Sequence, residues 1–283
     1  MAASARFPDL RPDWPLLRHA LAQLGISAST VVWTDPEVKW EEFDLVVANG
    51  AWDNIHRPDE FVAWADRVAA VTGLVNSPDT LRWNLDKRYL DVLAAAGVPT
   101  VPTAWLESRS PVPDLPGGQY VVKPTVSGGS FQTARYGPGD DERARAHIER
   151  LLGEGRTVMV QPFQPSVDAE GETGVVFLGG RYSHAINKGP MLRPGEDAVD
   201  GLWHHEVLRA TTPTPAHLEA ARQALDTAES LLGPTTYARV DLVTRSDGTP
   251  AVLELELLDP ALFFELHPEG APRFARVLRD RLR

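Results

Sequence analysis

The first third of the chain alternates between two hydrophobic periods, one typical of helices and one typical of buried strands. The predicted elements are helices at 14–24 and 58–70 and strands at 31–33, 45–48 and 74–76. Asp13 is the predicted cap of the first helix, and Gly25 ends it. Short apolar runs alternating with helices predict an open α/β sheet with parallel strands. Ligands of such sheets bind at the carboxyl ends of strands, here the loops 49–53 and 76–78.

The very start of the chain departs from this pattern. A Rossmann-like domain normally opens with a strand, whereas here a loop and a helix come first. We therefore expect the first strand to be missing, either because the native start lies upstream of Met1 or because the domain has lost an edge.

The rest of the chain mixes helices with antiparallel hairpins. We expect helices at 86–96, 143–152, 215–232 and 272–282, a strand at 157–161, and strand pairs at 120–123 with 131–136, 174–178 with 181–187, and 237–243 with 251–257. The polar stretch 190–202 is a predicted mobile loop. The fold class is α/β with α+β lobes, divided into an N-terminal α/β domain (1–85), a small lobe with a glycine loop (86–160) and a large lobe (161–283).

Three carboxylates are predicted to meet on the last strand pair. Glu254 and Glu256 are two residues apart in an apolar strand, so both point to one face. Asp241 and Arg239 lie on the partner strand and reach the same face. Three clustered carboxylates need a counter-charge, which a hard divalent cation such as Mg²⁺ supplies. The alternative is a solvated strand face with alternating charges.

Lysine is rare in this chain. Only four of the 28 basic residues are lysines, and three of these, Lys87, Lys123 and Lys188, lie in segments that suit a nucleotide site. Lysine offers a compact point charge for a phosphate oxygen. A small-residue loop of Ser127, Gly128, Gly129 and Ser130 follows Lys123, and its backbone can approach a phosphate closely. Surface lysines kept by chance and an ordinary turn are the alternatives.

A strand end between the two lobes suits an adenine base. Gln161 and Phe163 offer backbone edges and an aromatic cover, and Glu172 begins the next strand, where a carboxylate can hold ribose hydroxyls. A simple strand end and a solvent-facing acid are the alternatives. His184, His204 and His205 have no metal-ligand spacing, so we expect packing or substrate-loop roles for them. Trp52, Trp83 and Trp203 are expected to be core or rim aromatics.

Composition limits the remaining classes of function. The chain has 283 residues, a net charge of −11 and no cysteine. An acidic chain argues against a general nucleic-acid binder, although it leaves room for a local ATP site. The absence of cysteine excludes disulfides, thiolate metal sites and thiol nucleophiles. No long apolar run predicts a membrane span, and a cytoplasmic protein is the default.

Taken in order, these segments resemble the ATP-grasp superfamily of carboxylate–amine ligases. The resemblance covers about residues 75–265, and the α/β region before it matches the pre-ATP-grasp domain of that family. Within the superfamily the chain is most similar to the actinobacterial branch related to glutathione synthetase and to the O-ureido-serine cyclo-ligase of D-cycloserine biosynthesis. The segments Trp83–Leu90, Val160–Phe163 and Leu253–Glu256 carry this closer likeness.

The resemblance implies a role for each candidate residue. Lys87, Lys123 and the loop from Ser127 to Ser130 would bind ATP phosphates, Gln161 and Phe163 the adenine, Glu172 the ribose, Lys188 the phosphates or an acyl phosphate, Arg239 the transferring phosphoryl group, and Asp241, Glu254 and Glu256 one or two Mg²⁺. Many ATP-grasp enzymes have Asn where Glu256 stands. Thr173 and the loop 49–54 also depart from close relatives, so substrate choice is expected to differ.

The leading hypothesis is an ATP-dependent ligase that joins an amino-acid-like carboxylate to an amine through an acyl phosphate. An intramolecular cyclo-ligase, a non-catalytic ATP-binding regulatory module and a plain α/β scaffold stay open as alternatives. A small amino-acid-like molecule is the expected partner, with no nucleic acid or membrane. Such ligases are often dimers, so a homodimer is a further expectation.

Overall fold

The computed structural model describes residues 1–5, 12–107, 112, 114–198 and 207–282. Its N-terminal region contains two separate pairs of parallel strands rather than one continuous sheet. The elements there are β1 (Ala2–Ala3), α1 (Asp13–Gln23), β2 (Val31–Val32), η1 (Trp40–Glu42), β3 (Leu45–Val47), η2 (Trp52–His56), α2 (Pro58–Ala69), β4 (Gly73–Val75) and α3 (Pro78–Leu85). β1 pairs with β2 and β3 pairs with β4, both in parallel. The expectation of a missing first strand is therefore wrong, because β1 occupies its place.

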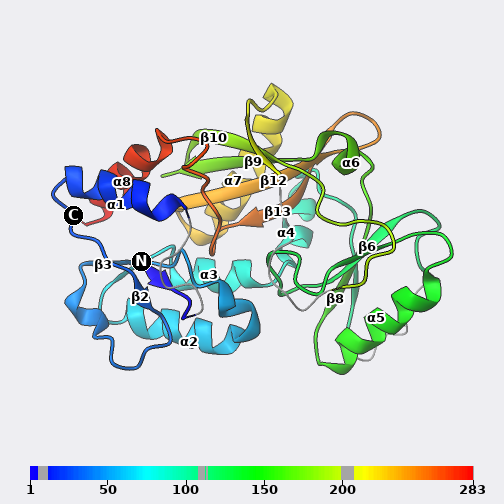
Figure 1. Cartoon of the computed structure of the whole chain (residues 1–283), viewed down its shortest axis with the longest axis horizontal. Helices are drawn as coiled ribbons and strands as arrows, with labels where there is room; N and C mark the ends of the chain where they lie inside the picture. Colours follow the sequence, from blue (N-terminus) through cyan, green and yellow to red (C-terminus); the bar gives the residue numbers. More distant parts are fainter. Residues whose placement is uncertain (6–11, 108–111, 113, 199–206, 283) are drawn as a thin grey trace.

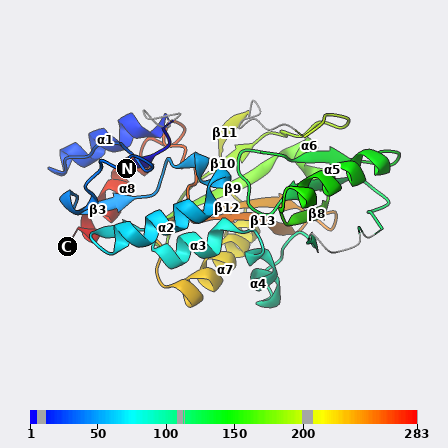
Figure 2. The same ribbon diagram turned by 90° about the horizontal axis from the view of Figure 1, so that it is seen from below.

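A five-stranded antiparallel sheet forms the centre of the molecule (Figure 1). Its strands, in the order β11-β10-β9-β12-β13, are β11 (Leu208–Thr211), β10 (Arg181–Lys188), β9 (Glu172–Leu178), β12 (Tyr237–Thr244) and β13 (Pro250–Glu256). Because strand side chains alternate, Val175 and Phe177 of β9 face one core and Val176 and Leu178 face another. The first core contains α4 (Tyr89–Ala95) and α7 (Pro215–Leu232), and the second contains α1 and α8 (Gly270–Arg281) (Figure 2).

A four-stranded antiparallel sheet lies at the other end of the molecule from the N-terminal region (Figure 1). Its order is β5 (Ala104–Leu106), β8 (Val158–Pro162), β6 (Tyr120–Pro124) and β7 (Ala134–Tyr136). Helix α5 (Asp141–Gly153) packs against it through Ile148 and Leu151. The predicted hairpin around the glycine loop is confirmed, since β6 and β7 pair antiparallel across residues 125–133.

Local sequence signals explain the elements that form where they were predicted. Helix α7 has the predicted bounds because Thr214 caps it, accepting from the His217 N–H at 3.3 Å, and Pro215 occupies the first turn. The hairpin of β9 and β10 turns at Gly179 and Gly180 as expected, with both residues at positive φ. The last strand pair also forms, within one residue of the predicted strands.

Other elements differ from expectation. The loop 76–78 starts helix α3, in which Ser77 caps the Thr80 N–H at 3.2 Å. Asp13 does not cap α1. It is the first residue of the helix, and its carboxylate bonds to a distant loop instead. The sequence analysis also missed β5, β11 and the short helix α6 (Ser166–Glu170).

Some expectations stay predictions. The division of the chain at 85/86 and 160/161, the homodimer and the cytoplasmic location are among them. Among the described residues, no helix is both long and apolar enough to cross a bilayer. Of the predicted loop 190–202, residues 199–202 lie outside the described part of the chain, as do Trp203, His204 and His205.

Candidate functional site

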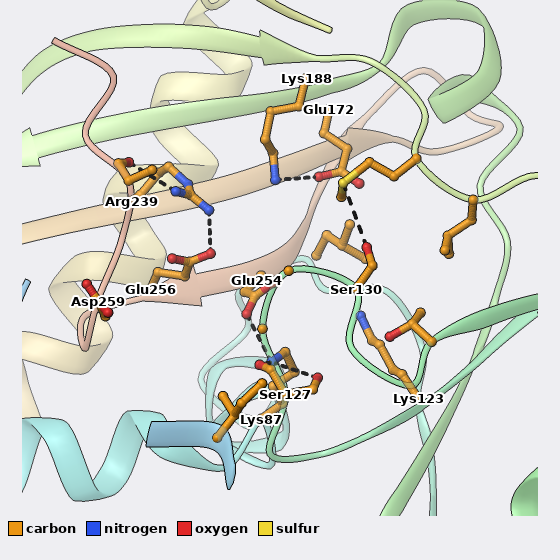
Figure 3. Close-up of a pocket in the computed structure, with 18 of the residues that line it drawn as sticks. Lys87, Lys123, Ser127, Ser130, Glu172, Lys188, Arg239, Glu254, Glu256 and Asp259 are labelled. Atoms are coloured by element: carbon orange, nitrogen blue, oxygen red, sulfur yellow. Dashed lines mark hydrogen bonds and ion pairs between the residues drawn. The ribbon is translucent and has the colours of Figure 1, made fainter. Parts of the chain in front are cut away.

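A cavity of about 570 Å³ lies where the two sheets and the N-terminal region meet. Every residue that the resemblance assigns to the nucleotide or the metal, except Asp241, lines it, and Asp241 lies directly behind, bonded to two of the lining side chains. Figure 3 shows the labelled side chains among them converging from β6, β9, β10, β12, β13, the glycine loop and, for Lys87, the segment between α3 and α4. The sequence therefore located one site from segments spread over about 170 residues, from Lys87 to Glu256.

The three carboxylates gather as predicted. Asp241 on β12 stands opposite Glu254 on β13, and Arg239 stands opposite Glu256. One ligand atom from each acid lies within 4.8 Å of the others. A register shift follows Asp241 in the ladder, so this pairing holds at the acid end of the strands. The alternative of a solvated strand face is excluded for Asp241, which is 1% exposed.

Cations surround these acids. The Lys188 Nζ lies 2.8 Å from both Asp241 and Glu172, and the Lys87 Nζ lies 3.1 Å from Glu254. Arg239 donates from Nε to Asp241 at 2.8 Å and also bonds to Glu256. The site is therefore a dense ionic network in which each acid already has a positive neighbour.

Burial and charge change the pKa of each acid differently. Burial by itself raises the pKa of Asp241, but Arg239 and Lys188 outweigh it and hold that pKa well below the usual range. Burial raises the pKa of Glu256 to about 7, because Arg239 only partly offsets burial and two neighbouring acids. Protein cations therefore do not fully compensate the cluster, and added positive charge would stabilise its ionised form.

One glycine makes room for the acid cluster. A Cβ on Gly174 of β9 would lie 2.9 Å from the Asp241 Oδ1 and 2.9 Å from the Ile186 Cδ1. Gly174 is the register partner of Asp241 between the two strands. The missing side chain thus lets the buried carboxylate sit against the neighbouring strand.

The glycine loop closes the cavity on the side of the small sheet. Gly129 and Ser130 have φ of 56° and 61°, a left-handed backbone that glycine adopts without strain. The Lys87 ammonium donates to the Ser127 carbonyl at 2.5 Å, which ties the loop to the segment before α4. Burial lowers the pKa of Lys123 to about 8, although Glu254 opposes the shift. This lysine is therefore charged at neutral pH and loses its charge only as the pH rises through about 8.

The strand end at 161–163 contributes through its backbone and one ring. The Gln161 side chain donates to Thr103 at 2.9 Å, so that side chain is already used. The Phe163 ring stacks under the guanidinium of Arg135, whose Cζ lies 3.4 Å from the ring centroid. Arg135 in turn makes a bidentate pair with Asp168 at 2.8 and 2.7 Å. Arg135 was not predicted from the sequence, because the pairing of β6 with β7 is what brings it close to the strand end at 161–163.

The N-terminal loops have mixed outcomes. Trp52 of the loop 49–53 lines the cavity, together with Asn54 and Ile55 beyond it. Asn49 instead donates to the Pro260 carbonyl at 2.8 Å. Asn76 does not line the cavity. Its amide bonds to the backbone of Thr236, Tyr237 and Leu257, so the prediction of a binding loop at 76–78 is wrong.

Two further residues singled out from the sequence lie outside the cavity lining, and two loops whose residues were not among the candidates form part of it. The predicted packing role of His184 is confirmed, since it is 2% exposed and bonds to the Leu262 carbonyl at 2.7 Å. Trp83 packs against Tyr89 as expected. Two loops add further lining. The loop after β13 contributes Leu258, Asp259, Ala261, Phe263 and Glu265, and the start of the loop at 190 contributes Met191 and Leu192.

Comparison with known proteins places this architecture. Residues 1–76 match the family model described as the N-terminal domain of D-cycloserine synthetase DcsG. The cycloserine biosynthesis protein DcsG of Streptomyces lavendulae is 39% identical over 286 residues, covering 96% of this chain and 94% of that protein. The crystal structure of D-cycloserine synthetase DcsG has a TM-score of 0.91 at 37% identity, covering 100% and 98% of the two chains.

A more distant structure shares the fold alone. D-alanine–D-alanine ligase from Bacillus anthracis has a TM-score of 0.65 at 15% identity, covering 94% of this chain and 89% of that one. The fold, the cavity and the similarity along the whole chain agree with one another. This chain is an enzyme of the ATP-grasp ligases and belongs to the family of the cycloserine biosynthesis protein DcsG.

Proposed function

We propose that this enzyme uses ATP to close a ring within one amino-acid-like substrate, as a D-cycloserine synthetase. The observation that carries the proposal is the similarity along the whole chain to the cycloserine biosynthesis protein DcsG, at 39% identity, and to the D-cycloserine synthetase DcsG of known structure, at 37% identity. D-Alanine–D-alanine ligase, which would suggest joining two molecules, shares only the fold at 15% identity. The intramolecular reading is therefore favoured over ligation of two separate amino acids.

The nucleotide would lie between the two sheets. Lys87, Lys123 and the loop from Ser127 to Ser130 would bind its phosphates, with Lys188 close to the transferred group. Phe163, held from behind by Arg135, offers its ring to the adenine, and the backbone at Gln161 offers polar edges. Glu172 lies beside Lys188 and would accept from the ribose hydroxyls. This placement is supported by the shared cavity that these residues line.

The acid cluster fits one or two Mg²⁺. Carboxylate oxygens are the ligands that this hard cation prefers, and three of them come within 4.8 Å of one another here. The raised pKa of Glu256 supports the same assignment, because a cation would favour its ionised form. Asp241, Glu254 and Glu256 would hold the ions, which would neutralise charge on the phosphate oxygens when bound.

The protein contributes position and charge to the chemistry. The substrate carboxylate attacks the γ-phosphorus, so a C–O–P bond forms, the P–O bond to ADP breaks and ADP leaves. A nitrogen of the same molecule then attacks the acyl carbon, phosphate leaves, and the nitrogen loses its proton. Where that nitrogen carries a carbamoyl group, as in O-ureido-serine, hydrolysis must then release the group as carbon dioxide and ammonia to give D-cycloserine. Arg239 and Lys188 are fixed by their acid partners and would stabilise the negative charge on the transferred group. Closure by the glycine loop and by Met191 and Leu192 would keep water from the acyl phosphate.

Product analysis distinguishes ring closure from ligation of two molecules. O-ureido-D-serine, D-alanine and a panel of dipeptides are each supplied with Mg-ATP, and ADP release and product mass are followed. We expect ADP and the cyclic product from O-ureido-D-serine without a second amine. Turnover that needs two amino acids, or a linear dimer as product, would refute the proposal.

The same assay tests the site assignment. Glu254→Gln and Lys123→Ala should each reduce ADP formation more than about 100-fold while leaving the circular dichroism spectrum unchanged. Glu219→Gln, on the exposed face of α7, is the matched control and should keep full activity. Turnover near wild type in either site variant would remove that residue from the site.

A further inference from the structure

Asp13 is a buried carboxylate bonded to a loop about 250 residues away. It is 6% exposed and accepts from the backbone N–H groups of Leu262 at 3.1 Å and Phe263 at 3.0 Å, and also from Phe264. A buried charge is stable only when hydrogen bonds compensate its lost hydration. Here all the compensating bonds that the structure gives come from one short loop.

That loop forms the wall behind Arg239. The Ala261 carbonyl accepts from the Arg239 Nη1 at 3.0 Å, and the Phe263 ring centroid lies 5.4 Å from the Arg239 Cζ. Phe263 itself has a φ of 54°, a left-handed conformation that non-glycine residues rarely adopt. Such a backbone persists only when its surroundings hold it, and Asp13 bonds to the N–H of this residue and of both its neighbours.

The loop is fixed from several directions. Asn49 holds the Pro260 carbonyl at 2.8 Å, and His184 holds the Leu262 carbonyl at 2.7 Å. Together with Asp13 and Arg239, these side chains bond to every residue from 260 to 264. The loop therefore has one defined position, and Arg239 takes its own position partly from it.

Docking of helix α1 does not require a charge. Leu17, Ala20 and Leu21 already pack α1 against Phe274 and Leu278 of α8 in an apolar core. A neutral residue at position 13 would leave this packing in place. The carboxylate thus has a local task at the loop, distinct from attachment of the helix.

We propose that Asp13 is a positioning residue for the ligase reaction, acting on Arg239 through the loop 260–264. It fixes the Ala261 carbonyl and the Phe263 ring, which in turn set the orientation of the guanidinium toward the transferred group. Small errors in the position of such a group slow the chemical step strongly while leaving binding of the nucleotide nearly unchanged. The inference concerns Arg239 and is independent of which amino-acid-like substrate is used.

Asp13→Asn tests the proposal, because it keeps the shape and removes the anionic acceptor. We expect kcat to fall about 10- to 100-fold, with KM for ATP changed by less than about threefold. Asp79→Asn is the matched control, since Asp79 also lies in the first turn of a helix but is exposed and does not line the cavity. A kcat equal to wild type, after correction for the folded fraction, would overturn the proposal.

A double-mutant cycle separates positioning from a general loss of stability. Phe263→Leu removes the ring beside Arg239, and its effect should overlap with that of Asp13→Asn, so the double variant loses less than the product of the two losses. Losses that multiply would show independent action and refute the link. If Asp13→Asn does not fold, Asp13→Glu, which keeps the charge but moves it, replaces it in the cycle with the same expectation.

Hydrogen exchange gives a readout that needs no substrate. In Asp13→Asn, the amides of residues 262–264 should exchange faster, while those of β12 should keep their wild-type rates. Unchanged exchange in the loop would contradict the proposed mechanism. Failure of the D-cycloserine assay alone would leave these results intact, so the two proposals are separately decided.

Discussion

At the scale of single residues, the lysines of this chain are concentrated in the candidate site. Three of the four lysines line the cavity, whereas Lys39 lies exposed beside Glu42. The sequence predicted this from the rarity of lysine among many arginines together with the segments in which the three lysines lie. The lowered pKa of Lys123 could not be predicted in the same way, since it depends on the residues from other segments that line the cavity around it.

The lowered pKa of Lys123 predicts a pH effect on nucleotide binding. Burial lowers the pKa from 10.5 to about 8, so the free enzyme loses this charge as the pH rises through about 8. A bound phosphate favours the charged form and raises the pKa again, so binding at pH 9 should take up a proton. Binding at pH 7 should take up none from Lys123, because the ammonium is already present.

Calorimetry in two buffers of different ionisation enthalpy measures this uptake. Lys123→Arg keeps a charge at every pH and should abolish the uptake at pH 9, while Lys39→Arg should retain it. Equal uptake in both variants would assign the proton to another group.

The lowered pKa of Lys123 also affects stability. Its effect on the folding free energy has the opposite sign to that of a lysine whose pKa is raised by an acidic partner. The depressed pKa costs folding free energy below about pH 8, and this cost fades as the pH approaches 10.5.

At the scale of elements, the alternation of side chains along a strand gave the most useful prediction of the site. A period of two put Glu254 and Glu256 on one face, and the turn at 246–249 put Asp241 opposite them, as observed. The pattern could not predict which strand lies on the other side of β12. Pairing of β9 with β12 brings Gly174 beside Asp241, and that contact joins residues 67 positions apart.

Gly174→Ala is predicted to impair the site without unfolding the sheet. An added methyl would lie 2.9 Å from the Asp241 Oδ1, so the carboxylate or the strand must shift. We expect ADP formation to fall about tenfold or more. Alanine in a strand should otherwise be neutral or stabilising, because glycine loses more entropy on folding.

A second strand glycine provides the control for that variant. In Gly73→Ala of β4 the new methyl would meet only the end of the Leu45 side chain at 3.1 Å and the Asp44 carbonyl at 3.5 Å, away from the cavity. Its ADP release should match wild type. Full activity in Gly174→Ala would show that Asp241 tolerates displacement, and the close approach would then have no catalytic meaning.

At the scale of the whole molecule, sequence reasoning predicted individual helices and hairpins but not the side-chain contacts that join them. Helix α7 and the hairpins carry local signals in their caps and glycines, and they form where expected. These contacts are made by buried polar side chains whose hydrogen-bond partners are distant in the sequence. Asn76, predicted to bind a ligand, bonds to Thr236 and Leu257 instead. No local pattern distinguishes an amide that binds a ligand from one that joins two segments.

Asn84 makes another of these contacts and allows a test of them. Its Nδ2 donates to the Leu255 carbonyl at 2.7 Å, and its Oδ1 accepts from the Leu257 and Leu258 N–H groups at 2.7 and 3.0 Å. Asn84→Ala would leave buried backbone groups without these partners. We expect the free energy of unfolding to fall by about 2–4 kcal/mol, measured by urea denaturation.

Gln223→Ala, on the exposed face of α7, is the control for this stability measurement. It should change the free energy of unfolding by less than about 0.5 kcal/mol. Because Asn84 joins the end of α3 to the strand that carries Glu254 and Glu256, loosening it should also disturb the acid cluster before the chain unfolds. ADP release should therefore decline at urea concentrations below the unfolding midpoint in Asn84→Ala. Coincident loss of activity and structure would show that this contact stabilises the fold without ordering the site.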